Sequence, residues 1–294
     1  MNVDLAVVTP AYLDYTFVGL EALPGPGEER FAGDMLRSPG GGAITAVGAS
    51  RLGLKTALVA PLGDDLAGRF VRQALKDEGI AVGEPRGNRT PTTVVMPVAG
   101  ERSMVTVDPG VRARASDLEP LSPRAVAATL EQIDLLPGGM RTYVTCGDDD
   151  ARAFAGRLPH VQHRMCALFV NRREAAVLTN ADTPEAAAER LAEVAETAVV
   201  TLGPNGAIAW IDGRPLSVPA VNDRPVIDTT GAGDLFAAAF AWADLAGADA
   251  ELALAWANLY AGLSVSSHTG VGGAVTRARL IEEGERRGLP PLPA

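Results

Sequence analysis

The fold of this chain is decided by the stretch Val226–Phe240, which reads VIDTTGAGDLFAAAF. Asp228 and Asp234 stand six positions apart around a run of very small residues, and an apolar helix-like segment follows at once. One interpretation is a strand-to-helix turn in which an aspartate caps the helix, the commoner role for an acid at such a place. The other is a phosphate-binding loop that contains a catalytic base, because small residues leave the N–H groups at a helix start open to an oxyanion.

Composition restricts the class of protein. The chain has 294 residues, of which 47% are hydrophobic and 5% aromatic, as expected for one large α/β domain with helices packed on a parallel sheet. A net charge of −10 without a basic run argues against binding to nucleic acid or to an anionic membrane. The two cysteines, Cys146 and Cys166, form neither a zinc motif nor a disulfide framework. We find no signal peptide and no apolar run of membrane-spanning length, and therefore expect a cytoplasmic protein.

Hydrophobic patterning predicts alternating strands and helices, which indicates a parallel sheet with right-handed crossovers. Residues 10–14 are expected to form a loop, and residues 15–38 an irregular stretch. Residues 90–107 are two β-rich runs around Ala-Gly-Glu-Arg, which predicts a hairpin. The main predicted strands cover residues 3–9, 55–60, 142–146, 168–171 and 198–202, and the main predicted helices residues 40–53, 66–78, 149–157, 183–195, 232–246 and 250–265.

Residues 228–241, DTTGAGDLFAAAFA, resemble the C-terminal signature of the PfkB (ribokinase-like) family of sugar and nucleoside kinases. Further similar motifs follow the family's order over nearly the whole chain: GGGAITAVGASRLG at 40–53, GDDLAGRFVRQALKDEGI at 63–80, GERSMV at 100–105, NRREA at 171–175 and TLGPNG at 201–206. The resemblance implies a ribokinase-like three-layer α/β/α sandwich over residues 1–294, with a mostly parallel central sheet. It also implies a small β-sheet lid, formed by segments of about 11–37 and 88–108.

On the donor side, the resemblance implies ATP as the phosphate donor, together with Mg²⁺. Asp234 resembles the family's catalytic base, which reverses the preference for a cap. The amides of Gly231, Ala232 and Gly233 resemble its anion hole. Asn171 and Glu174 resemble the residues that organise Mg²⁺ and its waters. The nucleotide-binding positions that the family implies are Asn171, Thr201, Gly203, Gly206 and Asn258. Asp228 and the carbonyl of Thr230 resemble the ligands of a monovalent cation such as K⁺.

On the acceptor side, Asp14 resembles the carboxylate that holds sugar hydroxyls, since a carboxylate accepts two neighbouring O–H donors. Gly41 and Gly42 would let the sugar touch the backbone, and Tyr12 would stack on a ring or a base. The resemblance thus implies transfer of the γ-phosphate to a hydroxyl of a sugar, a sugar acid or a nucleoside. A homodimer that pairs through its lids is the expected assembly, because an exposed sheet edge favours a partner.

Two departures from the family bear on the acceptor. The family usually places an asparagine where this chain has Ile44 and Thr45, and residues 101–171 leave room for one βα unit fewer than usual. We therefore keep three alternatives: a sugar kinase, a nucleoside kinase favoured if Tyr12 stacks on a base, and a catalytically silent metabolite-binding homologue.

Overall fold

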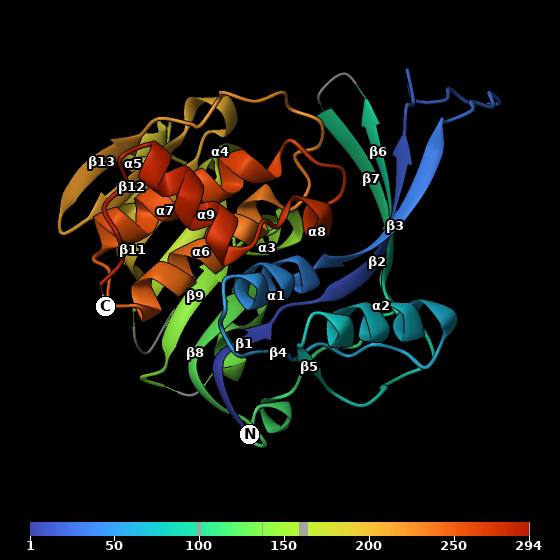
Figure 1. The fold of residues 1–294 in the computed structure, drawn as a ribbon, viewed down its shortest axis with the longest axis horizontal. Coiled ribbons are helices and arrows are strands. Elements are labelled where there is room, and N and C mark those ends of the chain that lie inside the picture. Colours follow the sequence, from blue (N-terminus) through green and yellow to red (C-terminus); the bar gives the residue numbers. More distant parts are fainter. Residues whose placement is uncertain (99–100, 137, 159–163, 294) are drawn as a thin grey trace.

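The computed structural model describes residues 1–98, 101–136, 138–158 and 164–293. It contains a nine-stranded sheet with helices on both faces and a separate four-stranded sheet (Figure 1). The predicted mostly parallel α/β sandwich with an additional small sheet is confirmed.

The central sheet has the strand order β13-β12-β11-β10-β9-β8-β1-β4-β5. Every neighbouring pair from β11 to β5 is parallel, whereas β12 and β13 add an antiparallel hairpin at one end. Because parallel strands end at the same edge of a sheet, the loops that follow them meet there. The strands are β1 Asn2–Val8, β4 Thr56–Leu58, β5 Ala81–Val82, β8 Ser122–Thr129, β9 Arg141–Thr145, β10 Met165–Asn171, β11 Ala195–Thr201, β12 Ala207–Ile211 and β13 Arg214–Val218.

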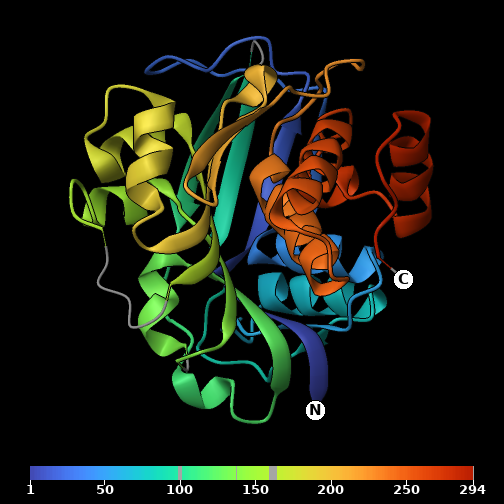
Figure 2. The ribbon, with the colours of Figure 1, turned by 90° about the vertical axis from the view of Figure 1, so that its left-hand side faces the viewer.

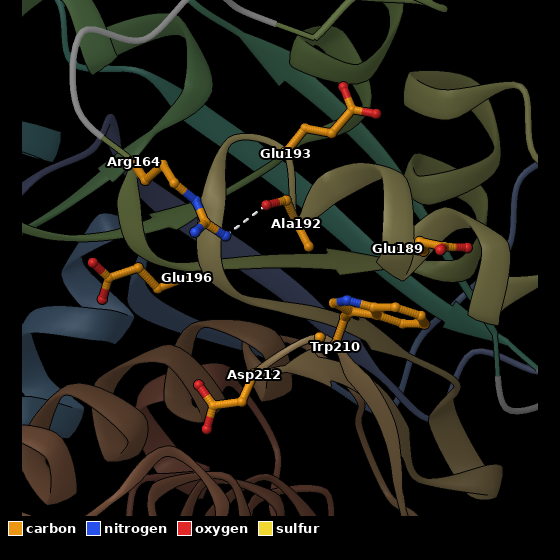
Figure 3. Close-up of a pocket in the computed structure, with 8 residues that line it drawn as sticks. Arg164, Glu189, Ala192, Glu193, Glu196, Trp210 and Asp212 are labelled. Carbon is orange, nitrogen blue, oxygen red and sulfur yellow. Dashed lines mark hydrogen bonds between the residues drawn. The ribbon is translucent and has the colours of Figure 1, made fainter.

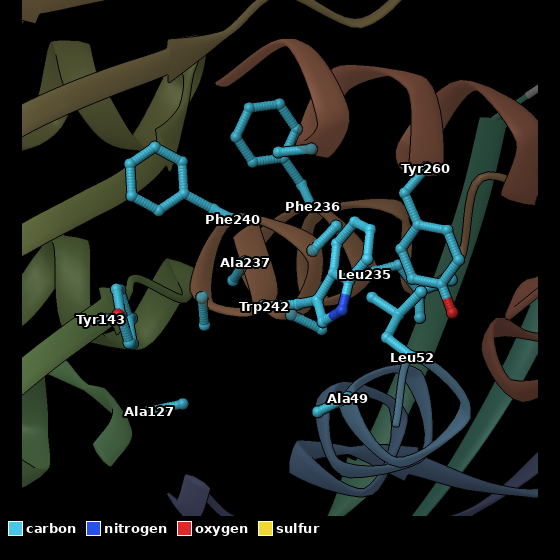
Figure 4. Close-up of a cluster of buried hydrophobic side chains, with 14 of the residues drawn as sticks. Ala49, Leu52, Ala127, Tyr143, Leu235, Phe236, Ala237, Phe240, Trp242 and Tyr260 are labelled. Atoms are coloured by element: carbon cyan, nitrogen blue, oxygen red, sulfur yellow. The ribbon is translucent and has the colours of Figure 1, made fainter. Parts of the chain in front are cut away.

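Helices form a layer on each side of this sheet (Figure 2). Side chains alternate along β10: Phe169 packs edge-on against Phe236 and Phe240 of α6, whereas Leu168 and Val170 join a second core with α4 and α5. The first core also contains α1, α2 and α7, and its large side chains include Trp242 and Tyr260 (Figure 4). The helices are α1 Gly42–Arg51, α2 Leu66–Asp77, α3 Asp148–Ala153, α4 Arg172–Thr179, α5 Pro184–Leu191, α6 Ala232–Leu245, α7 Ala250–Ser264, α8 Gly270–Gly273 and α9 Arg277–Arg286.

The small sheet has the order β3-β2-β6-β7 and consists of β2 Ala11–Val18, β3 Asp34–Gly41, β6 Thr92–Val98 and β7 Glu101–Val107. The predicted hairpin corresponds to β6 and β7, although Ala99 and Gly100 of its turn lie outside the described residues. In β2, Asp14 stands beside Ser38 of β3 and Thr93 of β6.

Two predictions about this architecture were wrong. Residues 11–14 belong to β2 and not to a loop, because the chain turns at Thr9 and Pro10 and the irregular segment is confined to residues 19–33. The region between residues 101 and 171 is not short of a strand, since β8 pairs with both β1 and β9 in the middle of the sheet. Its sequence, SPRAVAAT, is rich in alanine, which has a low β-propensity and hides the strand.

Candidate active site

A large cavity of about 1610 Å³ opens at the carboxyl ends of the parallel strands. Residues that follow or end β1, β8, β9, β10 and β11 line one side of it, namely Thr9, Thr129, Thr145, Asn171 and Thr201. The small sheet contributes the other side through Tyr12, Arg102, Met104 and Thr106. This edge is where ligands bind in open α/β sheets, so the topology alone makes the cavity the candidate active site.

Asp234 lies in this cavity, in the first turn of α6. Its Oδ1 accepts a hydrogen bond of 3.1 Å from the hydroxyl of Thr45, a buried residue of α1. Burial raises the pKa of Asp234 to about 6, against the lowering effects of the Thr45 hydrogen bond and the positive charge of Arg102. At neutral pH, most Asp234 side chains are therefore ionised and able to accept a proton.

The loop before α6 has the shape expected of an anion-binding turn. Gly231 has a φ of 77°, and a Cβ on it would come within 2.9 Å of the Cα of Gly270 and the side chain of Ile44. Gly233 lines the cavity, and a Cβ on it would meet nothing within 4 Å. The amide of Ala232 instead donates to the carbonyl of Thr229 at 3.3 Å. The structure thus brings Gly231 and Gly233 to the cavity beside Asp234, whereas Ala232 closes the turn.

Asp228 anchors this loop through hydrogen bonds to backbone amides. Its carboxylate is buried and accepts the amide N–H groups of Thr230 at 2.8 Å and of Thr269 at 3.0 Å. Thr269 has a φ of 64°, which is strained for a β-branched residue. The hydroxyl of Thr230 is buried and has no hydrogen-bond partner within the described part of the chain. Asp228 therefore fixes residues 229–233 to the segment that precedes α8. We call residues 229–233 the anion loop, after their predicted role.

Asn171 and Glu174 form a reciprocal cap at the start of α4. Asn171 donates its amide N–H and its Nδ2 to the two carboxylate oxygens of Glu174, at 2.8 and 2.6 Å, and accepts the Glu174 amide N–H at 2.9 Å. Burial raises the pKa of Glu174 to about 7, and the charges of Asp148 and Asp150 add to the effect. Both residues line the cavity together with Arg172 and Arg173.

Elsewhere on the donor side, the predicted residues divide into two groups. Thr201 and Gly203 line the cavity. Gly206 has a φ of 88° in the turn between β11 and β12, where a Cβ would come within 1.9 Å of the carbonyl of Val218. Asn258 of α7 donates its side-chain amide to the carbonyl of Pro219 at 2.8 Å. Gly206 and Asn258 therefore both pack against residues 218–220, the segment at the end of β13.

Three of the predicted acceptor residues belong to the small sheet, Tyr12 and Asp14 to β2 and Gly41 to β3, and Gly42 begins α1. Tyr12 and Gly41 line the cavity, and a Cβ on Gly41 would come within 2.5 Å of the Tyr12 ring. Gly42 is buried against Thr9. Asp14 is buried directly beside Gly40, where a Cβ would come within about 2 Å of the carboxyl group. Burial, together with the charges of Asp234 and Asp228, raises the pKa of Asp14 to about 7.

Sequence reasoning missed several cavity residues. Arg102 lies within the GERSMV motif, and its Nη1 is 3.4 Å from the hydroxyl of Thr229. Thr45, noted only as part of a departure from the family, is the hydrogen-bond donor to Asp234. Three further charged residues, Asp108, Arg112 and Glu131, meet at the acceptor end. No local motif marks these three, because they come from the residue after β7, the following loop and the segment after β8.

A second hollow lies at the opposite edge of the central sheet (Figure 3). Arg164, Glu193, Trp210 and Asp212 are among its lining residues, and Arg164 donates to the carbonyl of Ala192 at 2.6 Å. None of the predicted site residues lines it. In the described ranges, no helix combines the length and the apolar character that a bilayer crossing requires.

Comparison with known proteins agrees with this geometry. A ribokinase of Bacillus subtilis is 30% identical over 279 residues, covering 88% of this chain and 92% of the relative. The structure of Arabidopsis thaliana ribokinase complexed with ribose and ATP superimposes with a TM-score of 0.76 at 24% identity, covering 96% and 99% of the two chains. Phosphofructokinase-2 of Escherichia coli, in complex with potassium, gives a TM-score of 0.78 at 17% identity, covering 98% and 100%. The model of the pfkB family carbohydrate kinases matches residues 15–276. The chain therefore belongs to the pfkB family of carbohydrate kinases, which are phosphotransferases with a hydroxyl group as acceptor.

Proposed function

We propose that the protein transfers the γ-phosphate of ATP to a hydroxyl of a sugar, with Asp234 as the catalytic base. The observation that carries the proposal is the position of Asp234 beside Gly231 and Gly233, in the one cavity that also contains Tyr12 and Asn171. This arrangement supports a base and an anion-binding turn acting in the same cavity as residues proposed to bind the two substrates. A helix cap alone would not require this arrangement.

Phosphoryl transfer depends mainly on positioning and on stabilising charge. The acceptor hydroxyl would lie against Asp234 and give its proton to the carboxylate as its oxygen bonds to the γ-phosphorus. The bond from that phosphorus to the β,γ-bridging oxygen would break, and ADP would leave with the bond's electron pair. The Thr45 hydroxyl holds that carboxylate in place. The backbone N–H groups of the loop and the guanidinium of Arg102 would stabilise the charge on the transferred group. The small sheet would act as a lid that excludes water from the reaction.

Mg²⁺ would accompany ATP and neutralise charge on the phosphates. Among the described residues, no group of three or more acidic, cysteine or histidine side chains is arranged to hold a metal ion. In kinases, Mg²⁺ keeps several of its waters and binds chiefly to the phosphates of the nucleotide. Asn171 and Glu174 would hold those waters.

For K⁺, Asp228 and the carbonyl of Thr230 are the proposed ligands. The unpartnered Thr230 hydroxyl beside them is consistent with a bound polar species.

Acceptor-dependent ADP formation tests the proposal. The purified protein, supplied with ATP, Mg²⁺ and K⁺, would be assayed against sugars, sugar acids and nucleosides. We expect turnover with one or more sugars and background ATP hydrolysis without an acceptor. Turnover with nucleosides only would favour the nucleoside kinase, which the cavity position of Tyr12 keeps open. Tight ATP binding without turnover on any acceptor would favour the catalytically silent homologue.

We also propose a homodimer that pairs through the small sheet. Val105 and Val107 of the edge strand β7 are 62% and 53% exposed on its face away from the cavity, whereas Met104 and Thr106 line the cavity. An exposed apolar edge strand of this kind favours pairing with a second copy.

A further inference from the structure

The acceptor end of the cavity contains an arginine that is already neutralised. Arg112 contacts Asp108 through Nη1, at 2.9 Å from Oδ2, and Glu131 through Nε, at 3.1 and 3.2 Å from the two carboxylate oxygens. All three residues line the cavity. The hydrogen bond to Glu131 and the charge of Asp108 raise the pKa of Arg112, although burial acts against this.

The backbone of this arginine is fixed as well. The guanidinium of Arg86 pairs with Asp117, at 2.7 Å, and also donates to the carbonyl of Arg112. Arg112 therefore spans from Asp108, just after β7, to Glu131, just after β8, with its guanidinium engaged by both carboxylates. We call these three residues the charge lock.

The charges around the charge lock are negative in sum. Its two carboxylates outweigh its single guanidinium, and the charges of all three residues act on the neighbouring Tyr12. The other arginine at this end, Arg102, points toward Thr229 on the anion loop, where the transferred phosphate would lie. Asp150 accepts the amide N–H of Glu131 at 3.2 Å and adds a further carboxyl group. Burial raises the pKa of Tyr12 to about 12, so that it is a neutral hydroxyl at pH 7.

We propose that the charge lock selects an uncharged polyhydroxylated acceptor and rejects an acceptor that carries a carboxylate or a phosphate. An anionic group would meet carboxylates and would have to displace one of them from Arg112. Hydroxyl groups, by contrast, donate well to carboxylate oxygens. The inference rests on the proposed function for the identity of the site, and it adds the class of acceptor.

Binding without nucleotide tests this selection independently of catalysis. Calorimetry would give dissociation constants of the wild-type protein for two pairs of probes, each pair differing by one carboxylate at the end remote from the primary alcohol: D-ribose and D-ribonate, and D-glucose and D-gluconate. In at least one pair, we expect the uncharged member to bind at least tenfold more tightly than its anionic counterpart. Equal or tighter binding of the anionic members, or no binding of any probe, would overturn the inference.

Variants of the charge lock give the second test. The double variant Asp108→Asn, Glu131→Gln frees Arg112, and the preference for the uncharged member should fall at least tenfold or reverse. Arg112→Met leaves both carboxylates unpaired and should increase the preference. Glu189→Gln at the distant hollow is the control and should leave the ratio unchanged (Figure 3). With folding verified by circular dichroism, an unchanged ratio in either Arg112→Met or the double variant would overturn the charge lock.

Phosphoryl transfer is measured separately from these affinities. A protein that binds uncharged sugars with the expected preference but transfers no phosphate would contradict the proposed kinase reaction and support the selection.

Discussion

At the scale of single residues, two positions of the anion loop are glycine for different reasons. Gly231 needs a positive φ and has the backbone of Gly270 directly against it. Gly233 has open space around its Cα, and that space belongs to the cavity. One glycine is therefore required by the fold, whereas the other leaves room for a ligand.

Two alanine variants separate these roles. Gly231→Ala should unfold at a lower temperature, because alanine is strained at the φ of 77° and its methyl group would overlap Gly270 and Ile44. Gly233→Ala should keep the wild-type melting temperature to within a few degrees but lose phosphoryl transfer, because its methyl group would occupy the approach of the phosphate. Thermal unfolding and kcat would be measured for both, and full activity of Gly233→Ala would contradict an anion site at that amide.

The Thr45 hydroxyl should set the pH at which the enzyme becomes active. Because Asp234 must be ionised to act as a base, kcat should rise with pH through about 6. Thr45→Val removes a hydrogen bond that lowers the pKa of Asp234, so the rise should move to higher pH. The pH profile of kcat at saturating substrates measures this shift, and an unmoved profile in Thr45→Val would show that the rise does not report Asp234.

At the scale of elements, α9 is joined to the segment that leads into the anion loop. Glu283 of α9 is 1% exposed and contacts four arginines, among them Arg224 and Arg287. Arg287 also contacts Asp223. These ion pairs therefore hold residues 223 and 224 against α9. Asp228 follows only a few positions later in the chain.

Glu283→Gln should weaken this junction by roughly 1.5–3 kcal/mol of unfolding free energy, the usual range for hydrogen bonds to a charged group. Although burial acts to raise it, the arginines lower the pKa of Glu283 to about 2. A group with a lowered pKa stabilises the fold above its unfolded pKa, near 4.5, and the contribution disappears as the pH falls toward 2. Denaturant unfolding at pH 7 and pH 3 should show a smaller difference between wild type and variant at pH 3, and an equal difference would argue against the ionised cluster.

Much of this arrangement of elements could be predicted from local patterns. The helix after DTTGAGD and the strand before NRREA were predicted because apolar runs and caps lie close together in the sequence. β8 was missed because alanines and prolines give a weak strand signal. The charge lock was missed for another reason: Asp108 and Arg112 are four positions apart, but Glu131 reaches Arg112 only through the tertiary fold. Sequence spacing does not show that Glu131 pairs with Arg112.

At the scale of the whole molecule, the two sheets divide the work. The central sheet holds Asn171 and Thr201, the proposed nucleotide-binding residues, at the ends of β10 and β11, and the small sheet places Tyr12 and Arg102 in the same cavity.

The proposed dimer predicts a concentration-dependent mass in sedimentation equilibrium. Wild type should sediment as a dimer, and the double variant Val105→Lys, Val107→Lys should sediment as a monomer, because burying two lysines at the pairing face is unfavourable. Leu66→Lys on α2 provides a control, since Leu66 is 80% exposed but lies outside the small sheet. A monomeric wild-type protein, or a dimeric double variant, would contradict pairing through β7.

The most direct measurement of the central claim compares phosphoryl transfer by wild type, Asp234→Asn and Asp212→Asn, with ATP affinity determined for each. Asp212 is exposed at the distant hollow, at a φ of 50° that asparagine tolerates, and its variant should behave as wild type. If Asp234 is the base, Asp234→Asn should lose about 10²–10⁴-fold in kcat while binding ATP with unchanged affinity. Retention of wild-type kcat in Asp234→Asn would contradict the account.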